Sequence, residues 1–357
     1  LIRTVFPKRR MWRFMQTVRN NTVQSVIITG CAGLLGSHMS RHLLKRGYRV
    51  IGIDNLSGGY EDLLPDDENF VFYNFNLESS TECPSRLDVI FEEEDPLACY
   101  HFAAYAAEGL SAFIRHFNYT NNVLSSVNVI NACIKRDCKI VFTSSLAVYG
   151  EARTPFKEDM IPNPIDPYGI AKYTVEMDLE QASRQFGLKY TIIRPHNVVG
   201  IYQNIWDKYR NVVGIFIRRA LDNEPMLVYG DGEQVRAFSD IQYYMEPFEK
   251  LIDCCDGEIF NLGSDQTHTL NELANLVKRA AKGNGVSATI EHVEPRHEAK
   301  YAFCDHSKAK KSNLKFEDNT DLESLINEMF VWAIRQPKRE QKHMRYEIEN
   351  GIYDYWK

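Results

Sequence analysis

A tyrosine and a lysine four residues apart have the spacing of a proton-transfer pair. Tyr168 and Lys172 stand in the stretch Tyr-Gly-Ile-Ala-Lys, and on a helix residues i and i+4 share one face. An ammonium group near a phenol lowers its pKa from the ordinary value of about 10. A phenol tuned in this way can exchange a proton with a substrate hydroxyl near neutral pH. We therefore predict that Lys172 lowers the pKa of Tyr168, although the same spacing also occurs on ordinary solvated helix faces.

A glycine-rich turn precedes this pair in the chain. Gly30, Gly33 and Gly36 follow the apolar run 26–29 and open a helical pattern over 34–46. In a βαβ unit the first glycine permits a tight turn, the second lets the backbone approach a pyrophosphate, and the third lets the helix pack on the sheet. The next strand is predicted at 50–53, so the context is the one that a dinucleotide fingerprint requires. An ordinary glycine-rich βα turn is the alternative.

The carboxylate that ends the second predicted strand indicates which dinucleotide would bind. Asp54 can accept hydrogen bonds from both ribose hydroxyls of an adenosine and would repel a 2′-phosphate. No arginine occurs at 55–59, so NAD is favoured over NADP. The alternative is that Asp54 only caps the turn before Asn55.

Strands and helices continue to alternate, which predicts an α/β fold with a Rossmann-type, doubly wound parallel sheet. Further strands are predicted at 70–74, 98–102, 139–143 and 189–194, and helices at 111–135 and 168–186. After Pro195 the elements shorten, which indicates a smaller C-terminal lobe. There Thr269 and Glu272 have the spacing of a capping box that opens a helix. A last helix is predicted over 322–335.

Composition excludes several classes of function. Of the 357 residues 25% are charged and 44% hydrophobic, and the net charge of −6 gives no general case for nucleic-acid or membrane binding. No apolar run approaches the roughly 18 residues that a membrane span needs. The eight cysteines and the histidines show no metal-ligand spacing, so we expect no metal site and reduced thiols in the cytoplasm.

The first 20 residues are basic, and no acid occurs before Asp54. Such a leader is typical of an organellar transit segment. It is equally compatible with an ordered arm packed on the body through Phe6, Trp12 and Phe14.

Several motifs, taken in their order along the chain, resemble the extended short-chain dehydrogenase/reductases, in particular their nucleotide-sugar branch and its UDP-glucose 4-epimerases. Besides the glycines and Asp54 they are His101-Phe102-Ala103-Ala104, Thr143-Ser144-Ser145, Tyr168 with Lys172, and Arg194-Pro195-His196-Asn197. The resemblance spans roughly residues 25 to 335. It implies a basic N-terminal extension (1–24), an NAD-binding Rossmann domain (25–196), a mainly substrate-binding lobe with segments returning to the first domain (197–345), and a C-terminal tail (346–357).

The same resemblance implies roles for individual residues. Tyr168 would be the catalytic base, Lys172 would tune it and bind the nicotinamide ribose, and Ser145 would hydrogen-bond the reacting hydroxyl. The diphosphate of a nucleotide-sugar, most simply a UDP-sugar, would bind Asn197, Arg236 and Arg296 while the sugar meets Ser145 and Tyr168. NAD would contact Gly30, Gly33, Leu34, Leu35, Gly36, Asp54, Asn55, Asn76, Leu77, Phe102, Ala103, Ala104, Asn121, Ser144, Tyr168, Lys172 and His196.

Two positions after Ser145 distinguish branches of the family. Dehydratases and decarboxylases carry acids there, whereas this chain has Leu146 and Ala147, neither of which can move a proton. The resemblance therefore implies hydride chemistry at one carbon, inversion at C4. Two alternatives stay open: a ketosugar reductase that releases its cofactor, and a non-catalytic nucleotide-binding sensor.

Two further expectations follow from the resemblance. The residue that limits bulk at the sugar's C2 falls on Ala302, which would admit an N-acetyl group, or on Phe303, which would exclude it. Helices 111–135 and 168–186 would pair with their copies in a four-helix homodimer interface. The alternative is that their apolar faces only cover the sheet.

Overall fold

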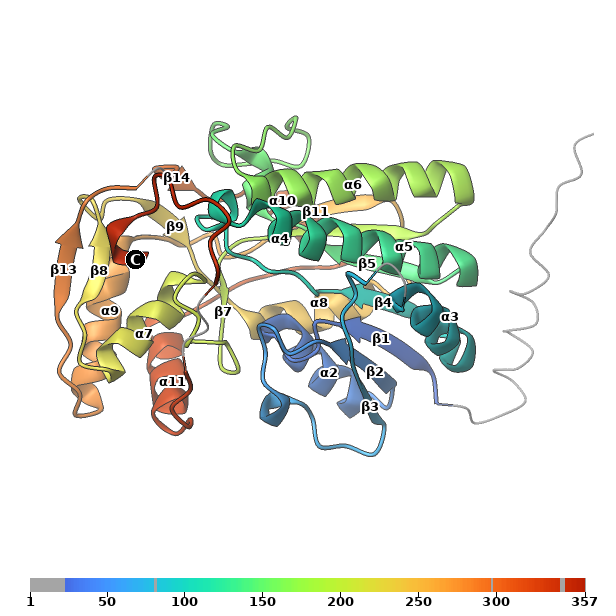
Figure 1. Cartoon of the computed structure of the whole chain (residues 1–357), viewed down its shortest axis with the longest axis horizontal. Helices are drawn as coiled ribbons and strands as arrows, with labels where there is room; N and C mark the ends of the chain where they lie inside the picture. The colour runs from blue at the N-terminus through green and yellow to red at the C-terminus, as the bar shows by residue number, and fades with distance from the viewer. Residues whose placement is uncertain (1–22, 80–81, 297, 341–343, 357) are drawn as a thin grey trace, which may run out of the picture.

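The computed structural model describes residues 23–79, 82–296, 298–340 and 344–356. The expected basic extension therefore lies almost entirely outside the described residues. Alternating strands and helices up to Pro195, joined by one later strand at Glu258–Leu262, form one sheet of seven strands (Figure 1). All six strand pairings are parallel, in the order β11-β6-β5-β4-β1-β2-β3. The predicted doubly wound parallel sheet is confirmed.

The strands are short apolar runs, as a parallel sheet covered on both faces requires. They are β1 (Ser25–Thr29), β2 (Arg49–Asp54), β3 (Phe70–Asn74), β4 (Ala98–His101), β5 (Lys139–Thr143), β6 (Tyr190–Pro195) and β11 (Glu258–Leu262). The predicted strands among these are confirmed, with ends displaced by one residue at most.

Helices cover the two faces of the sheet as separate layers. One layer contains α3 (Cys83–Glu94), α5 (Ser125–Arg136) and α6 (Pro167–Phe186). The other contains α2 (Leu34–Lys45), α8 (Met245–Lys250) and α10 (Ser307–Lys311). Each layer buries its apolar side chains against one face of the sheet, which gives two hydrophobic clusters.

The single helix predicted over 111–135 is wrong in detail. It is divided into a 3₁₀ turn (Ser111–Phe113), α4 (Arg115–Tyr119), a π-helical turn η3 (Thr120–Leu124) and α5. Ile114 has φ −133° and ψ 46°, which interrupts the helix. Thr120 and Ser126 each donate a side-chain hydrogen bond to the carbonyl four residues earlier, both at 2.7 Å, and such bonds bend helices.

A second lobe is built from the rest of the chain (Figure 1). Its helices are α7 (Val212–Leu221), α9 (Leu270–Gly283) and α11 (Leu322–Ile334). Its short strands are β7 (Val198–Val199), β8 (Met226–Tyr229), β9 (Val235–Ala237), β10 (Ser239–Asp240), β12 (Thr267–Thr269), β13 (Ile290–Val293) and β14 (Tyr301–Ala302). The predicted capping box opens α9, with both of its hydrogen bonds present between Thr269 and Glu272.

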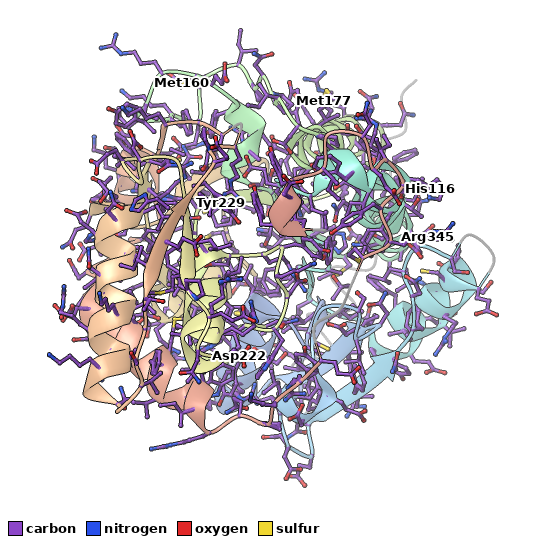
Figure 2. All side chains as sticks on the ribbon, turned by 60° about the vertical axis from the view of Figure 1, so that its left-hand side comes forward. His116, Met160, Met177, Asp222, Tyr229 and Arg345 are labelled. Atoms are coloured by element: carbon purple, nitrogen blue, oxygen red, sulfur yellow. The ribbon has the colours of Figure 1, made fainter. Side chains whose placement is uncertain are left out.

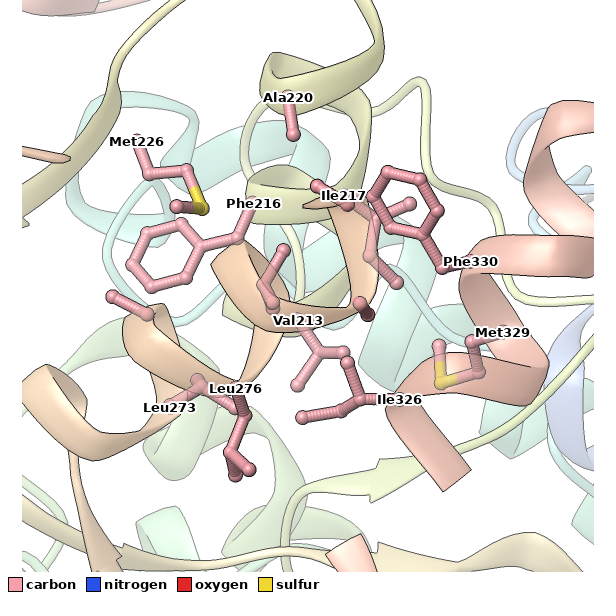
Figure 3. Packing of buried hydrophobic residues seen from close by; sticks show 14 of the residues in the cluster. Val213, Phe216, Ile217, Ala220, Met226, Leu273, Leu276, Ile326, Met329 and Phe330 are labelled. Atoms are coloured by element: carbon pink, nitrogen blue, oxygen red, sulfur yellow. The ribbon is translucent and has the colours of Figure 1, made fainter. Parts of the chain in front are cut away.

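The three helices of this lobe enclose a core of its own. Figure 3 shows Val213 of α7 beside Ile326 of α11, and Ile217 of α7 beside Phe330 of α11. Within the described residues no helix is long and apolar enough to cross a membrane. All eight cysteines are free thiols, and the Sγ atoms of the adjacent Cys254 and Cys255 lie 3.1 Å apart.

We expect Phe330→Ala to lower the free energy of unfolding by about 3–5 kcal/mol, because it leaves a cavity in this core. Phe330 is fully buried, whereas Ile334 on the same helix is 45% exposed. Ile334→Ala is the matched control and should cost less than about 1 kcal/mol. Denaturant unfolding of the two variants measures both values, and equal costs would contradict this description of the core.

Candidate active site

A cavity of about 910 Å³ lies where the carboxyl ends of the sheet strands face the second lobe, the place where open α/β sheets bind ligands. Nearly all of the predicted site residues line this cavity. Those that line it are Gly30, Gly33, Leu34, Leu35, Gly36, Asp54, Asn55, Asn76, Leu77, Phe102, Ala103, Ala104, Asn121, Ser144, Ser145, Tyr168, Lys172, Asn197, Arg236 and Arg296.

Two glycines of the turn after β1 are required by close backbone packing. Gly30 has φ +72°, and a Cβ on it would lie 2.7 Å from the backbone nitrogen of Ala103. A Cβ on Gly36 would lie 2.2 Å from the carbonyl oxygen of Gly30. Neither backbone segment can take a side chain here, so the turn presents bare peptide groups to the cavity.

The groups around this turn fit a dinucleotide. Helix α2 begins directly after Gly33 without a side-chain cap, so its first N–H groups and its positive dipole end are available to phosphates. The Asp54 carboxylate accepts from the backbone nitrogens of Ala32 (2.9 Å) and Leu56 (2.8 Å). These bonds fix its position at the end of β2, where the ribose of an adenosine would lie.

The first turn of α6 contains the tyrosine of the predicted proton-transfer pair. Asp166 caps this helix by accepting from the backbone nitrogen of Gly169 at 2.9 Å. Tyr168 follows in the first turn with 7% of its surface exposed. It lines the cavity together with Ser145.

The predicted effect of Lys172 on the phenol is not what the structure shows. Burial raises the pKa of Tyr168, and the nearby Ser145 side chain is the largest influence that lowers it. The Lys172 ammonium donates to the carbonyl of Thr143 at 2.8 Å and lies 5.9 Å from the centroid of the Tyr168 ring. Burial lowers the pKa of Lys172 itself to about 7, against the opposing charge of Glu176.

A buried ion pair holds α6 on the sheet. The Arg194 guanidinium on β6 and the Glu176 carboxylate on α6 make two hydrogen bonds, at 2.9 and 2.5 Å, and both side chains are 3% exposed. Arg194 also donates to the Tyr149 hydroxyl (2.7 Å), which donates to Asn261 on β11 (2.8 Å). Ser144 completes the network by donating to Glu176. The helix that carries Tyr168 is therefore fixed to two strands.

Two arginines define the part of the cavity that faces the second lobe. Arg236 and Arg296 each donate to the same carboxylate oxygen of Glu298 at 3.1 Å. The Arg296 guanidinium also lies 4.6 Å from the ring centroid of Tyr229. Asn197 is held nearby by its hydrogen bond to the Ala237 carbonyl at 3.0 Å. Two converging guanidinium groups suit a diphosphate.

Among the described residues, His196 is the one predicted site residue outside the cavity wall, and its contact with the cofactor stays a prediction. Its ring stacks on His306 at 5.2 Å, with the two Nε2 atoms 3.1 Å apart, and burial lowers the pKa of His196 to about 3. Pro195 and Asn197 on either side do line the cavity. The strand ends at Pro195 and the backbone turns at Asn197, which has φ +38°.

Sequence reasoning missed several residues of this wall. Glu108 follows β4 and faces the cavity, and burial raises its pKa to about 7, with Asp166 acting in the same direction and Arg236 and Arg296 opposing it. An acid just beyond a strand's carboxyl end is a signal that could have found it. Other missed residues include Arg210, Tyr229, Glu298, Tyr353, Tyr355 and Trp356.

Comparisons with known proteins agree with this geometry. The profile of the family described as "NAD dependent epimerase/dehydratase family" matches residues 26–263. A putative UDP-glucose 4-epimerase of Methanocaldococcus jannaschii is 30% identical over 86% of this chain and 97% of its own. A UDP-N-acetyl-alpha-D-glucosaminuronate decarboxylase of Bacillus cytotoxicus is 29% identical over 86% of this chain and 96% of its own. The crystal structure of UDP-glucose 4-epimerase from Thermotoga maritima with UDP-glucose has a TM-score of 0.80 and 32% identity, covering 87% of this chain and 99% of that one.

We expect Gly30→Ala to bind less than roughly a tenth of the NAD that the unmodified protein binds, because its Cβ would collide with the backbone of Ala103. Gly47→Ala is the control: Gly47 also has a positive φ (+86°), but a Cβ there meets nothing within 4 Å. NAD released from each purified protein on denaturation gives the comparison. Full NAD content in the Gly30 variant would refute this use of the turn.

Proposed function

The chain belongs to the NAD dependent epimerase/dehydratase family, and from this premise we propose that it is a nucleotide-sugar 4-epimerase acting on UDP-sugars of the glucose and galactose type. The observation that carries the proposal is that Tyr168 and Ser145 line the same cavity as the glycine turn and the two arginines. A residue suited to proton transfer, a turn suited to a dinucleotide and two arginines suited to a diphosphate thus line one cavity.

Each group has a defined task in this reaction. NAD, the family's cofactor, supplies a hydride acceptor and donor at the sugar's C4. Tyr168 takes the proton of the 4-hydroxyl and later returns it, while Ser145 hydrogen-bonds the same oxygen. Arg236 and Arg296 bind the diphosphate. Binding energy at that remote end keeps the 4-ketosugar in the site while the sugar turns its other face.

The residues beside Ser145 favour epimerisation over elimination or decarboxylation. Leu146 and Ala147 both line the cavity, and neither side chain can donate or accept a proton. Glu108 remains as an acid in the same cavity, but it follows β4 rather than β5. The chain therefore lacks the acids that the dehydratase and decarboxylase branches carry after the serine.

We assign Ala302, a small residue, as the gate, the residue that limits bulk at the sugar's C2. Ala302 on β14 lines the cavity, and Phe303 is not among the described residues that do. The Phe303 carbonyl instead accepts from the backbone nitrogen of Phe156 at 3.0 Å. A methyl group at the gate leaves room for a 2-acetamido group, so we propose that N-acetylated UDP-hexoses are also substrates.

We also propose that the protein is a homodimer that pairs through α5 and α6. Leu124, the last residue of η3 directly before α5, is 52% exposed, and Ile170 and Met177 on α6 are 39% and 48% exposed. Figure 2 shows Met177 at the outer edge. Exposed apolar side chains gathered on one face favour an interface. Light scattering should give twice the chain mass of 41.3 kDa, and Met177→Glu should shift the protein to the monomer. A single-chain mass for the unmodified protein would contradict the dimer.

We expect the purified protein to convert UDP-glucose, UDP-galactose and their N-acetyl counterparts into C4 epimers without added cofactor. Tyr168→Phe should reduce turnover at least about a hundredfold, because it removes the proton-transfer group, and should leave bound NAD unchanged. Tyr173→Phe makes the same change on the same helix outside the cavity wall and is the control. Chromatographic separation of the sugar nucleotides measures the products.

The other outcomes of this assay have definite meanings. Consumption of added NADH with a 4-ketosugar, and no epimer, would identify a reductase. Binding of UDP-sugars without turnover would identify a sensor. Either result, or full activity of Tyr168→Phe, would overturn the proposed function.

A further inference from the structure

The last described residues form part of the active-site wall, although the family profile ends at residue 263. We call Met344–Trp356 the C-terminal strap. Its first anchor is Glu347, whose backbone nitrogen donates to Phe113 (2.8 Å) and whose carboxylate accepts from the backbone nitrogens of His116 (2.7 Å) and Phe117 (2.8 Å). These groups open α4, beside the sheet. Figure 2 shows Arg345 and His116 on the same side of the molecule.

The second anchor lies at the other end of the strap. Ile352 and Trp356 are 8% and 5% exposed and pack in a hydrophobic cluster with Tyr105, Leu110 and Tyr209. Burial of an aromatic side chain and an aliphatic one contributes several kcal/mol in general, roughly 1.5–3 for each. The strap is therefore fixed to the body by packing and not only by its hydrogen bonds.

Polar contacts close this end further. The Trp356 carbonyl accepts from the Lys208 ammonium at 3.2 Å and from the Tyr346 hydroxyl at 2.8 Å. The Tyr346 hydroxyl also lies 2.6 Å from that of Tyr209. Figure 1 shows the C-terminus against the second lobe, near β8 and β9, so the strap bridges from α4 to that lobe.

Three strap side chains, Tyr353, Tyr355 and Trp356, line the cavity. The Tyr355 ring packs on Tyr229 of β8 with centroids 4.5 Å apart, and the Tyr353 ring stacks on Tyr355 at 5.3 Å and 5°. Tyr229 in turn contacts Arg296 through its ring. A chain of contacts thus runs from the strap to one of the two arginines that suit a diphosphate.

We propose that the C-terminal strap closes the lobe-facing part of the cavity over a nucleoside diphosphate, and that Tyr355 is a positioning residue that holds Tyr229, and through it Arg296, in the binding geometry. The ligand class rests on the proposed function. The physical gain is twofold. Ring stacking orders the guanidinium before the ligand binds, and a closed wall excludes water, which strengthens the attraction between guanidinium and phosphate.

The test is titration calorimetry of the full chain with UDP, GDP and dTDP. Tyr355→Ala should weaken the bound nucleoside diphosphate roughly tenfold or more, because it removes the stacking contact and opens the wall. Tyr355→Phe keeps the ring and should restore affinity to within about twofold. Both variants should retain the NAD content of the unmodified protein, since the glycine turn is untouched.

Two further variants separate the strap from a general loss of stability. Glu347→Ala removes the anchor at α4 without changing the cavity wall and should weaken nucleoside diphosphate binding in the same direction. Ile348→Ala, at a side chain that is 42% exposed, is the control and should have no effect. Unchanged affinity in both Tyr355→Ala and Glu347→Ala would overturn the strap proposal.

Hydrogen exchange of the unmodified protein tests the strap without any substitution. Amides of residues 344–356 should exchange more slowly when UDP is bound, since the strap then opens less often. Equal exchange rates with and without bound nucleotide would overturn the proposal. An unmodified protein that binds none of the three diphosphates overturns both proposals, whereas binding and protection without any epimer overturn the proposed function alone.

Discussion

The buried ion pair between Glu176 and Arg194 is the constraint on which the geometry of the site depends. Tyr168, Lys172 and Glu176 recur every fourth residue on α6, so one helix face carries both the catalytic groups and their anchor. Arg194 fixes that face to β6, and Tyr149 extends the network to β11. Breaking a buried pair generally costs about 3–5 kcal/mol, so rotation or sliding of the helix is strongly opposed.

Because the helix is fixed, Tyr168 keeps a constant position relative to two groups of the cavity wall: the glycine turn with Asp54, and the two arginines. The glycine turn and Asp54 come from the carboxyl ends of β1 and β2, whereas the arginines come from β9 and the loop after β13. Tyr168 and Ser145 lie between these groups in the chain's order and in the cavity wall. Groups of both charges influence the phenol. Burial raises the pKa of Tyr168; the carboxylates of Glu108 and Asp166 raise it further, and the Arg210 guanidinium lowers it. Proton transfer here therefore depends on the balance of charges in the whole cavity.

Local signals in the sequence predicted the sheet and the cofactor half of the site well. Short β-branched runs, glycines at fixed spacing and an acid at the end of a strand are each encoded within a few residues, and Gly30, Gly36 and Asp54 lie where that logic puts them. The break at Ile114 was missed because it lies in the backbone conformation, φ −133° and ψ 46°, and no glycine or proline marks it in the sequence. His196 was included through the family resemblance, whereas in the structure its ring stacks on His306 outside the cavity wall.

Long-range packing accounts for the rest. No spacing rule connects Glu298 with Arg236, which is 62 residues earlier, or Tyr355 with Tyr229. The predicted pairing of Lys172 with the phenol failed for the same reason, since the lysine's partner is the Thr143 carbonyl, which only the packed sheet supplies. The structure likewise places Ala302, not Phe303, in the cavity wall, a choice that a one-residue gap had left open.

The most direct test of the central claim follows the hydrogen at the sugar's C4. A UDP-hexose carrying deuterium at C4 is incubated with the purified protein in ordinary water, and the epimer is examined by mass spectrometry and NMR. Hydride removal and return at one carbon predicts that the product keeps its deuterium at C4. Loss of the label to solvent would show that a proton, not a hydride, leaves the carbon, and would contradict the account.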